Sequence, residues 1–531
     1  MMKVSAFCVT REKQLLEGDR EIANFLPAVV RAYWTTGTDG HDPPDIVIIR
    51  VQRDGWQDSP EKEIPYEALS RFDFERQFPG CVCADAQGRA TKKLVVRFIR
   101  ERIDQLPRDL RGVFLPTTGW HENRFVAGGQ LIGAGMYPSP MIAPSAAALS
   151  LSALPDFSDG EAAEGLLLML QHIADVGLPT FAYTLYSSLL SVFRAEGLPT
   201  TCVLNLHGAQ GFGKTTLAKR LCALYEVDGQ AADVFDAGSS FSAVRDALAE
   251  ARDRVVVLDD VCKSSDASNQ RKRLGEAAKL LRVATNEIPI VRKQGRKNAC
   301  VKCQAGLVIT GEIDFGTASD LTRCVHVKLN KPLTDGRAED RKLAATALAG
   351  YLRWFAANAE RERECLRIKY AAFRVCERSH REERLQISLW ELSWIWASFL
   401  RFARTAGAVS EEASKQIESR MDFALQQTFE YTQVQVAALE KQTLQNIAAV
   451  IERGVTTGAF PYFVHRGCIC VRSEKLQEYM QLVTGRTDLT VKDVTTILRR
   501  EQLLRMDASG DSTCKIKGKR MLCIPQQKLA M

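Results

Sequence analysis

The chain has 531 residues, which is long enough for three or four domains with cores of their own. A hydrophobic content of 46% and a charged content of 25% are those of an ordinary soluble protein. The net charge of +7 is mild for this length, so any binding of nucleic acid has to come from local basic patches and not from the chain as a whole.

The cysteine pattern favours reduced thiols. The 15 cysteines are mostly single and lie within apolar segments, which predicts a cytoplasmic location. Cys300 and Cys303 have CxxC spacing, but no second pair follows at the spacing of a zinc site. Cys468 and Cys470 would share one face of a strand. A metal site at either pair remains the less favoured alternative.

No membrane crossing is expected. No signal peptide opens the chain, and the most apolar span covers residues 164–193. Gln171, His172 and Asp175 interrupt this span, so a pair of packed helices is the better interpretation.

Residues 1–145 predict a small mixed α/β domain. Short β-prone runs such as DIVIIRV, KLVVRFI and RFVAGG alternate there with turns rich in Pro and Gly. The stretch 136–160 is rich in Pro, Ser and Ala and is typical of a linker. Two helices over about 160–195 follow, so residues 146–200 are interpreted as a segment leading into the next domain.

The stretch HGAQGFGKTTLAKRL (207–221) has the spacing of a phosphate-binding loop. It follows the β-prone run TCVLNL and precedes a segment with helical apolar spacing at Leu217, Leu221, Leu224 and Tyr225. Strand, loop and helix form the frame that a nucleotide site requires, and a glycine-rich turn with a coincidental lysine is the weaker alternative. The residues expected to hold ATP are Gly208, Gly211, Gly213, Lys214, Thr215 and Thr216.

The glycines, the lysine and the threonine of this loop are each expected to bind a different part of the nucleotide. Glycines let backbone N–H groups turn toward the β-phosphate, which sits at the positive end of the following helix. Lys214 would reach the β- and γ-phosphate oxygens, and the Thr215 hydroxyl would complete the shell of a Mg²⁺ ion.

An acidic pair ends the apolar run RVVVLDD (254–260), as expected of a buried parallel strand whose end faces the nucleotide. Asp259 would hold Mg²⁺ through water, and Asp260 could polarise the attacking water. An ordinary strand end explains such a pattern when it stands alone. The spacing from the loop is what a P-loop ATPase needs, so residues 201–331 are interpreted as its α/β core.

The rest of the chain is helical and then mixed. Residues 332–445 are nearly all helical in pattern, and Trp390, Trp394 and Trp396 at their apolar centre are expected in the core. Residues 446–531 give helix, helix and a two-stranded wing, the plan of a winged helix. Its basic clusters are a DNA-contact surface or, alternatively, a solvated face; they consist of Arg499, Arg500, Lys515, Lys517, Lys519 and Arg520.

Four elements in this order resemble a known family. TTGWHENRFV (117–126), the loop, VVVLDD and GLVITGE (306–312) are similar to the bacterial family of domain of unknown function 927, over about residues 60–400. Some members are carried on mobile genetic elements and resemble minichromosome-maintenance-type AAA+ helicases. The resemblance implies an AAA+ P-loop core with a helical lid over 332–445. Gly119, Trp120 and His121 are expected to pack and not to catalyse.

The resemblance also implies residue roles. Thr310 falls at the sensor-1 position and would orient the lytic water, and Arg323 falls where an arginine finger reaches the neighbouring subunit's γ-phosphate. Arg384 is a candidate sensor-2 arginine. A solvated strand-end arginine and a lid salt-bridge partner are the respective alternatives for the two arginines.

The segment 288–302 matches the pre-sensor hairpin that lines the pore of such rings, with a turn expected at Gln294-Gly295. Its basic residues are expected to contact nucleic acid, and a plain surface hairpin is the alternative. They are Arg292, Lys293, Arg296 and Lys297.

The sequence departs from the family pattern at two positions. Asp260 stands where many AAA+ enzymes have Glu, and Thr310 replaces the more usual Asn. A shorter acid puts the rate of hydrolysis in doubt, but not the binding of nucleotide.

The favoured prediction is an ATP- and Mg²⁺-dependent ring, a homo-hexamer, that translocates on or unwinds single-stranded or forked DNA. Such a helicase would serve the replication of a mobile genetic element. The alternative is an ATP-dependent DNA-binding switch that recruits replication or recombination proteins without unwinding. A weaker third hypothesis is a defence ATPase that senses a phage component.

Overall fold

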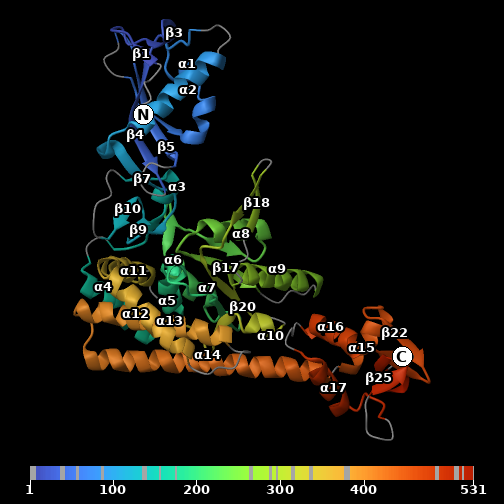
Figure 1. The fold of residues 1–531 in the computed structure, drawn as a ribbon. Helices are drawn as coiled ribbons and strands as arrows, with labels where there is room; N and C mark the ends of the chain where they lie inside the picture. The colour runs from blue at the N-terminus through green and yellow to red at the C-terminus, as the bar shows by residue number, and fades with distance from the viewer. Residues whose placement is uncertain are drawn as a thin grey trace. The chain divides into compact units, whose positions relative to one another are not determined.

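The structure is a computed structural model, and it describes residues 7–35, 42–55, 59–84, 89–133, 140–154, 157–173, 176–261, 267–285, 290–294, 297–312, 317–333, 339–375, 383–445, 447–484, 489–506, 513–516 and 519–529. It divides into two compact units, Met1–Ser150 and Leu151–Met531. Both units combine helices and strands (Figure 1), and the predicted mixed α/β class is confirmed at this level.

The first unit is built on a five-stranded sheet of order β11-β7-β4-β5-β6, in which β4 pairs antiparallel with β5 and parallel with β7. Two three-stranded antiparallel sheets, β1-β2-β3 and β8-β9-β10, accompany it. Its elements are β1 (Phe7–Val9), β2 (Leu15–Glu17), β3 (Arg20–Ala23), β4 (Leu26–Trp34), β5 (Ile46–Gln52), β6 (Lys62–Pro65), η1 (Tyr66–Arg71), α1 (Phe74–Gln77), α2 (Arg89–Asp104), η2 (Arg108–Leu110), β7 (Arg111–Leu115), β8 (Gly119–His121), β9 (Arg124–Ala127), β10 (Gln130–Ile132), β11 (Met141–Ile142) and α3 (Pro144–Ala147). The short strand β12 (Ser150–Leu151) stands at the boundary between the units.

One run of this unit differs from the prediction. KLVVRFI, which was expected to be β-prone, lies in helix α2. Val95, Val96, Ile99 and Ile103 are all buried, and their spacing follows one face of a helix. The valines favour a strand by local propensity, but the burial of a continuous helical face decides the structure.

The Gly-Trp-His element packs, as the sequence favours. Trp120 in β8 is buried against Phe125 of β9, with ring centroids 5.4 Å apart. The His121 Nε2 lies 2.9 Å from the carbonyl oxygen of Thr117.

The second unit contains the phosphate-binding loop. Its elements are α4 (Asp159–His172), α5 (Gly177–Ser187), α6 (Leu190–Ala195), β13 (Val203–Gly208), α7 (Lys214–Leu221), β14 (Tyr225–Val227), β15 (Gln230–Ala231), β16 (Val234–Asp236), α8 (Phe241–Glu250), β17 (Val255–Val261), α9 (Ala267–Thr285), β18 (Ile290–Gln294), β19 (Lys297–Val301), β20 (Gly306–Gly311), α10 (Ala318–Leu321), β21 (Cys324–Leu329), α11 (Asp340–Ala357), α12 (Ala359–Val375), α13 (Glu383–Thr405), α14 (Glu411–Gln445), α15 (Ile447–Thr456), β22 (Tyr462–His465), β23 (Cys468–Val471), α16 (Ser473–Thr484), α17 (Val491–Arg500), β24 (Thr513–Ile516), β25 (Lys519–Pro525) and η3 (Gln526–Lys528).

The centre of this unit is a five-stranded sheet of order β16-β17-β20-β13-β21, in which every neighbouring pair is parallel. The runs TCVLNL, RVVVLDD and GLVITGE supply β13, β17 and β20, and their apolar residues are buried. Strands buried on both faces explain these continuous apolar runs. The predicted parallel sheet is therefore confirmed.

Helices cover both faces of the sheet. Helices α8 and α9, with Val436 and Leu439 of α14, pack on one face. Helices α5 and α7 pack on the other, where the buried Tyr183 of α5 donates a hydrogen bond of 2.8 Å to the carbonyl oxygen of Leu307 in β20. The sheet thus lies between two helical layers.

Helix α7 is shorter than the apolar spacing predicts, because it ends at Leu221 while Tyr225 begins β14. Arg341 of α11 donates hydrogen bonds to the carbonyl oxygens of Ala223, at 2.8 Å, and Tyr225, at 3.0 Å. These contacts satisfy carbonyls beyond the helix end and make the early exit possible.

The predicted helical region contains α11 to α14. Trp394 and Trp396 of α13 are buried, and Trp390 stacks on Phe373 with ring centroids 5.0 Å apart. Helix α14 has 35 residues, which corresponds to about 50 Å at the usual rise per residue. Among the described residues, no helix is long and apolar enough to cross a membrane.

Residues 446–531 form the C-terminal module, whose described part has its own apolar core and a four-stranded sheet of order β22-β23-β25-β24. Helix α17 begins at the predicted Thr-containing turn, where Thr490 and Asp493 form a capping box. The expected linker, residues 136–160, contains β11, α3, β12 and the start of α4 in its described parts.

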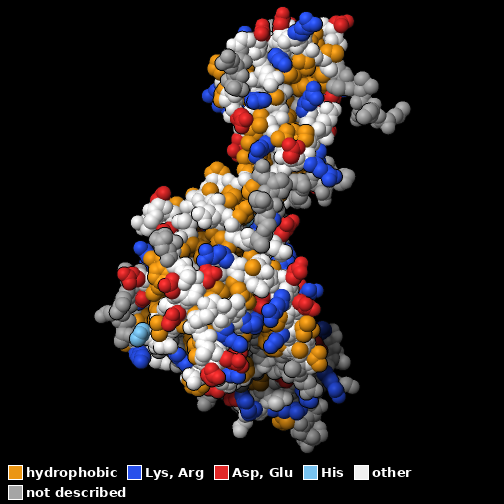
Figure 2. All heavy atoms as spheres, turned by 90° about the vertical axis from the view of Figure 1, so that its left-hand side faces the viewer, with side chains coloured by type: hydrophobic (Ala, Val, Ile, Leu, Met, Phe, Trp, Pro, Cys, Tyr) orange, Lys and Arg blue, Asp and Glu red, His pale blue; other side chains and the backbone are white. Residues whose placement is uncertain are grey.

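Charge is unevenly divided along the chain. On the face drawn in Figure 2, basic and acidic side chains are interspersed over both units. Residues 1–150 contain 19 Lys and Arg and 19 Asp and Glu, whereas residues 446–531 contain 14 basic against eight acidic residues, a net charge of +6. Most of the chain's net charge of +7 therefore belongs to the C-terminal module.

Candidate functional site

The glycine-rich loop connects the carboxyl end of β13 to the first residue of α7. Gly211 and Gly213 have φ values of 78° and 85°, in the left-handed region that glycine tolerates without strain. A Cβ at Gly208 would lie 2.7 Å from the carbonyl oxygen of Leu329 in β21, so a side chain there has no room. The loop therefore needs these glycines to curl over the start of the helix.

Lys214 is held over the loop that precedes it. Its side chain is buried, and its Nζ donates hydrogen bonds of 2.9 Å to the carbonyl oxygens of both Gly208 and Ala209. The ammonium group is thus placed at the concave side of the loop, where it could exchange these carbonyls for phosphate oxygens.

Asp259 receives two hydrogen bonds on one carboxylate oxygen. The Thr215 hydroxyl donates to Asp259 Oδ1 at 2.7 Å, and the Thr310 hydroxyl donates to the same oxygen at 2.5 Å. Thr215 is the second residue of α7, Asp259 lies near the end of β17, and Thr310 lies near the end of β20. Carboxyl ends of parallel strands meet at one edge, which brings these three distant residues together.

Thr310 also fixes the second acid of the pair. Its Oγ1 accepts a hydrogen bond of 3.0 Å from the backbone N–H of Asp260. Thr310 itself is fully buried. In this structure its hydroxyl is therefore occupied by the acidic pair, whereas the sequence-based expectation was that it orients water.

Asp260 has an unusual backbone conformation, with φ of 61° at a register shift between β17 and β20. Its side chain is exposed at the carboxyl edge. The left-handed region is several-fold enriched in Asp among residues with a side chain, which accounts for Asp in place of the longer Glu here.

These groups suit a magnesium ion with a triphosphate. Mg²⁺ takes one or two protein oxygens and completes its shell with water and phosphate oxygens. The Thr215 hydroxyl and the Asp259 carboxylate offer that set. Among the described residues, no three His, Cys, Asp or Glu side chains form a metal cluster.

The two cysteine pairs are placed only in part. Cys303 is buried, and burial raises the pKa of its thiol, while the side chain of Cys300 lies outside the described residues. Cys468 and Cys470 are both buried in β23, and the Sγ of Cys470 lies 3.7 Å from the Sγ of Cys523.

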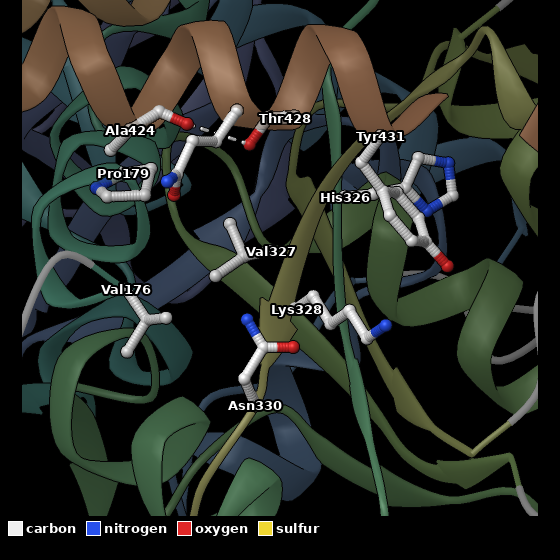
Figure 3. A pocket seen from close by; sticks show the side chains of 10 residues that line it. Val176, Pro179, His326, Val327, Lys328, Asn330, Ala424, Thr428 and Tyr431 are labelled. Carbon is white, nitrogen blue, oxygen red and sulfur yellow. Dashed lines mark hydrogen bonds between the residues drawn. The ribbon is translucent and has the colours of Figure 1, made fainter. Parts of the chain in front are cut away.

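A cavity of about 290 Å³ lies beside the edge strand β21, between the start of α5 and helix α14 (Figure 3). Lys328 lies against the ring of Tyr431, with its Nζ 5.4 Å from the ring centroid. The same ring packs against His207, the last residue before the loop, at 4.8 Å between centroids. The lining residues are Val176, Pro179, His326, Val327, Lys328, Asn330, Ala424, Gln427, Thr428 and Tyr431.

This cavity was not found from the sequence. Its residues come from three segments that are far apart in the chain, and none carries a local pattern. Two features link it to the loop: Lys328 pairs with His207 in the sheet, and the Tyr431 ring packs against His207.

Arg323 lies at the opposite edge of the sheet. It directly precedes β21, which pairs in parallel with β13, so the length of the strand separates it from the loop by roughly 20 Å. Its side chain is 9% exposed, and its Nη1 donates to the carbonyl oxygen of Ser319 at 2.7 Å. Burial lowers the pKa of Arg323, and the nearby charge of Arg384 lowers it further.

The predicted site residues therefore fall into two groups. Lys214, Thr215, Asp259, Asp260 and Thr310 meet at the carboxyl edge of the sheet. Arg323 and the exposed Arg384, at the start of α13, lie near each other at the amino edge.

The predicted hairpin is present as two antiparallel strands, β18 and β19. Gln294 and Lys297 form the last pair of the ladder, and Gly295 of the predicted turn lies outside the described residues. Arg296 and the side chains of Arg292, Lys293 and Lys297 lie outside the described residues.

Comparison with known proteins adds a likeness of fold. No protein-family profile matches the chain, and no curated protein sequence matches it. The chain is similar to a solved structure of "SCCmec type IV Cch - active helicase", with a TM-score of 0.50, 11% identity and coverage of 99% of this chain and 98% of that one. At this identity the likeness shows a shared fold, and membership of the family of domain of unknown function 927 stays a prediction.

Two further solved structures align with lower scores. The apo C-terminal region of NrS-1 aligns with a TM-score of 0.28, 13% identity and coverage of 90% of this chain and 94% of that one. The JCV helicase aligns with a TM-score of 0.23, 14% identity and coverage of 50% and 74%.

Proposed function

We propose that the chain is an AAA+ ATPase that assembles into a homo-hexameric ring and translocates on or unwinds DNA for a mobile genetic element. The observation that carries the proposal is the carboxyl edge of the sheet, where the Lys214 loop, Asp259 and Thr310 meet. The fold that the chain shares with an active helicase supports the same reading.

The chemistry proposed at this edge is the hydrolysis of ATP. Backbone N–H groups of the loop bind the β-phosphate, and Lys214 leaves the two carbonyls to contact the β- and γ-phosphate oxygens. Thr215 and Asp259 would hold Mg²⁺, which neutralises phosphate charge when bound. Asp260, exposed at the edge, orients the water that attacks the γ-phosphorus.

Thr310 is proposed as a positioning residue for the acidic pair. It spans both acids with one hydroxyl, holding the Asp259 carboxylate and the Asp260 backbone at 2.5 Å and 3.0 Å. A residue that is not free to turn toward solvent acts through its partners.

Thr310→Val should lower the ATP turnover number by about 10²-fold while ATP affinity changes little, because the acids lose alignment but the loop is intact. Steady-state hydrolysis and equilibrium nucleotide binding measure the two effects separately. Thr310→Ser, which keeps the hydroxyl, is the matched control and should retain most of the turnover. Parental turnover in the Val variant would refute the positioning role.

The cavity beside β21 is proposed to receive the adenine base. Thr215 and Asp259 fix the Mg²⁺ and γ-phosphate end toward β20 and β17, so the nucleoside has to extend the other way from β13, toward β21. The Tyr431 ring, with Lys328 beside it (Figure 3), offers a surface against which a base can stack.

Tyr431→Ala should weaken ATP binding by about tenfold, because base stacking on an aromatic ring contributes on the order of 1–3 kcal/mol. The binding of inorganic tripolyphosphate, which has no base, should be unchanged. Phe423→Ala, at an exposed residue of the same helix, is the control. Equal losses for ATP and tripolyphosphate would place the effect on the loop and not on a base pocket.

A ring is proposed because Arg323 cannot serve its own nucleotide. It lies at the amino edge of the sheet, a strand length from the loop of its own subunit. An arginine finger at that edge is useful only if a neighbouring subunit presents its γ-phosphate there. Arg384, near Arg323, would belong to the same interface.

Two basic surfaces are proposed to contact DNA. The β18–β19 hairpin carries Arg292, Lys293, Arg296 and Lys297 and would line the channel. The C-terminal module, with α16, α17 and the β24–β25 hairpin, is proposed as a winged helix whose basic residues contact duplex. Its net charge of +6 favours contact with phosphates.

The second candidate function is a DNA-binding switch that uses ATP to recruit other proteins without unwinding. The charged C-terminal module favours it, since this module could bind duplex without a motor. The hairpin separates the two functions, because a switch has no need of basic residues in a channel.

Replacing Lys293 and Arg296 by Ala should stop the unwinding of forked DNA and lower the affinity for single-stranded DNA. The slope of the logarithm of the binding constant against the logarithm of the salt concentration should become less negative by about 0.7 for each phosphate contact that is lost. ATP turnover without DNA should survive, because the loop is untouched. Strand separation with ATP and salt-dependent binding are the measurements.

Lys369→Ala combined with Lys415→Ala removes the same charge from exposed helix positions and should leave unwinding intact. A hairpin variant that unwinds as well as the parent would favour the switch.

A chain ending at residue 445 should lose duplex binding but keep basal ATP turnover. A loss of turnover in that folded protein would show that the C-terminal module has a structural role.

A further inference from the structure

A single buried carboxylate at the amino edge of the sheet is shared by two arginines. Asp320 of α10 has a side chain that is 3% exposed, and Arg282, near the end of α9, holds it with three hydrogen bonds of 3.1 to 3.2 Å. Arg323 approaches the same carboxylate at 3.8 Å, and the Thr317 hydroxyl donates to its second oxygen at 2.8 Å. Both oxygens of Asp320 are therefore engaged.

The described charged groups that act on Arg323 are mostly positive. Guanidinium groups stay protonated at any ordinary pH, so Arg282, Arg323 and Arg384 bring three positive charges. Burial and the charges of Arg384 and Arg282 lower the pKa of Arg323, whereas Asp320 is the carboxylate that raises it. Among the described residues that act on Arg323, Asp320 is the one carboxylate, and a further anion would balance the remaining positive charge.

The two arginines bonded to Asp320 differ in accessibility. The Arg282 side chain is 51% exposed. The Arg323 side chain is 9% exposed, and its Nη1 donates a hydrogen bond to the carbonyl oxygen of Ser319. Arg282 is thus the arginine of this pair that a molecule approaching this edge contacts first. It also lies far from the loop of its own subunit, because α10 and the start of β21 stand at the opposite edge.

We propose that Arg282 and Arg323 together bind the terminal phosphate of the nucleotide held by the neighbouring copy of the chain, with Asp320 as the internal counter-ion that the phosphate replaces. The inference rests on the proposed ring and adds Arg282 to it as a catalytic residue. When water attacks the γ-phosphorus and the bond to the bridging oxygen breaks, ADP and inorganic phosphate form. The two guanidinium groups neutralise the charge that develops on the oxygens.

Sequence reasoning missed Arg282 for a simple reason. It stands in the amphipathic helix KLLRVAT, where an exposed arginine is ordinary. Its partner Asp320 is 38 residues away and comes close only through the packing of α9 against α10.

The test is a mixing experiment between inactive subunits. Arg282→Ala should lower ATP turnover by at least about 10²-fold in assembled rings, as expected on removal of a transition-state arginine. Mixed with Asp259→Ala subunits, which lack a working metal site, the variant should recover turnover, because some interfaces then pair an intact Arg282 with an intact site. Particle images confirm that the rings form, and Lys279→Ala, exposed on the same helix, should have no effect.

Two further variants separate contact with phosphate from support of Asp320. Arg282→Gln keeps a hydrogen-bond donor for Asp320 but not the charge, so a structural role predicts near-parental turnover, and the proposed contact predicts a loss close to that of Ala. Arg323→Ala mixed with Asp259→Ala tests the ring by itself. Recovery for Arg323 with parental turnover in Arg282→Ala would overturn the role of Arg282 alone. No recovery for either arginine in assembled rings would overturn action between subunits.

Discussion

The hydrogen bonds that meet at one oxygen of Asp259 hold the candidate site together. Thr215 brings the start of the loop helix to this oxygen, and Thr310 brings the end of β20 to it. Thr310 also accepts a hydrogen bond from the backbone N–H of Asp260, whose left-handed conformation does not fit a regular β-strand. The positions of the proposed metal ligands, Thr215 and Asp259, and of the second acid follow from this arrangement.

In the proposed ring, the parallel sheet divides the site between its two edges. Loop, acids and Thr310 gather at the carboxyl edge, while α10 and the start of β21 place Arg282 and Arg323 at the amino edge. The length of the strands separates the two edges, so the arginines lie away from the loop of their own chain. In the proposed ring, assembly with a neighbour would join the two edges.

The parts that the sequence predicts best are those made by consecutive residues. A phosphate loop and the acidic strand end depend on local spacing, so Lys214, Thr215 and Asp259 could be named from the residues alone. The bond from Thr310 to Asp260, the contact of Arg282 with Asp320 and the cavity at Tyr431 join segments far apart in the chain, and no local pattern announces them. KLVVRFI was wrong as a strand because its valines obscured a helical spacing.

The most direct test of the account is the rate of ATP turnover in Lys214→Ala, compared with Lys219→Ala in the same helix. Lys214 is buried against the loop carbonyls, whereas Lys219 is exposed. Each variant removes one positive charge, but only Lys214→Ala removes a proposed phosphate ligand. The account predicts that turnover falls by at least about 10²-fold in Lys214→Ala and is unchanged in Lys219→Ala, with both proteins folded. Parental turnover in Lys214→Ala would contradict the assignment of the carboxyl edge as the ATP site.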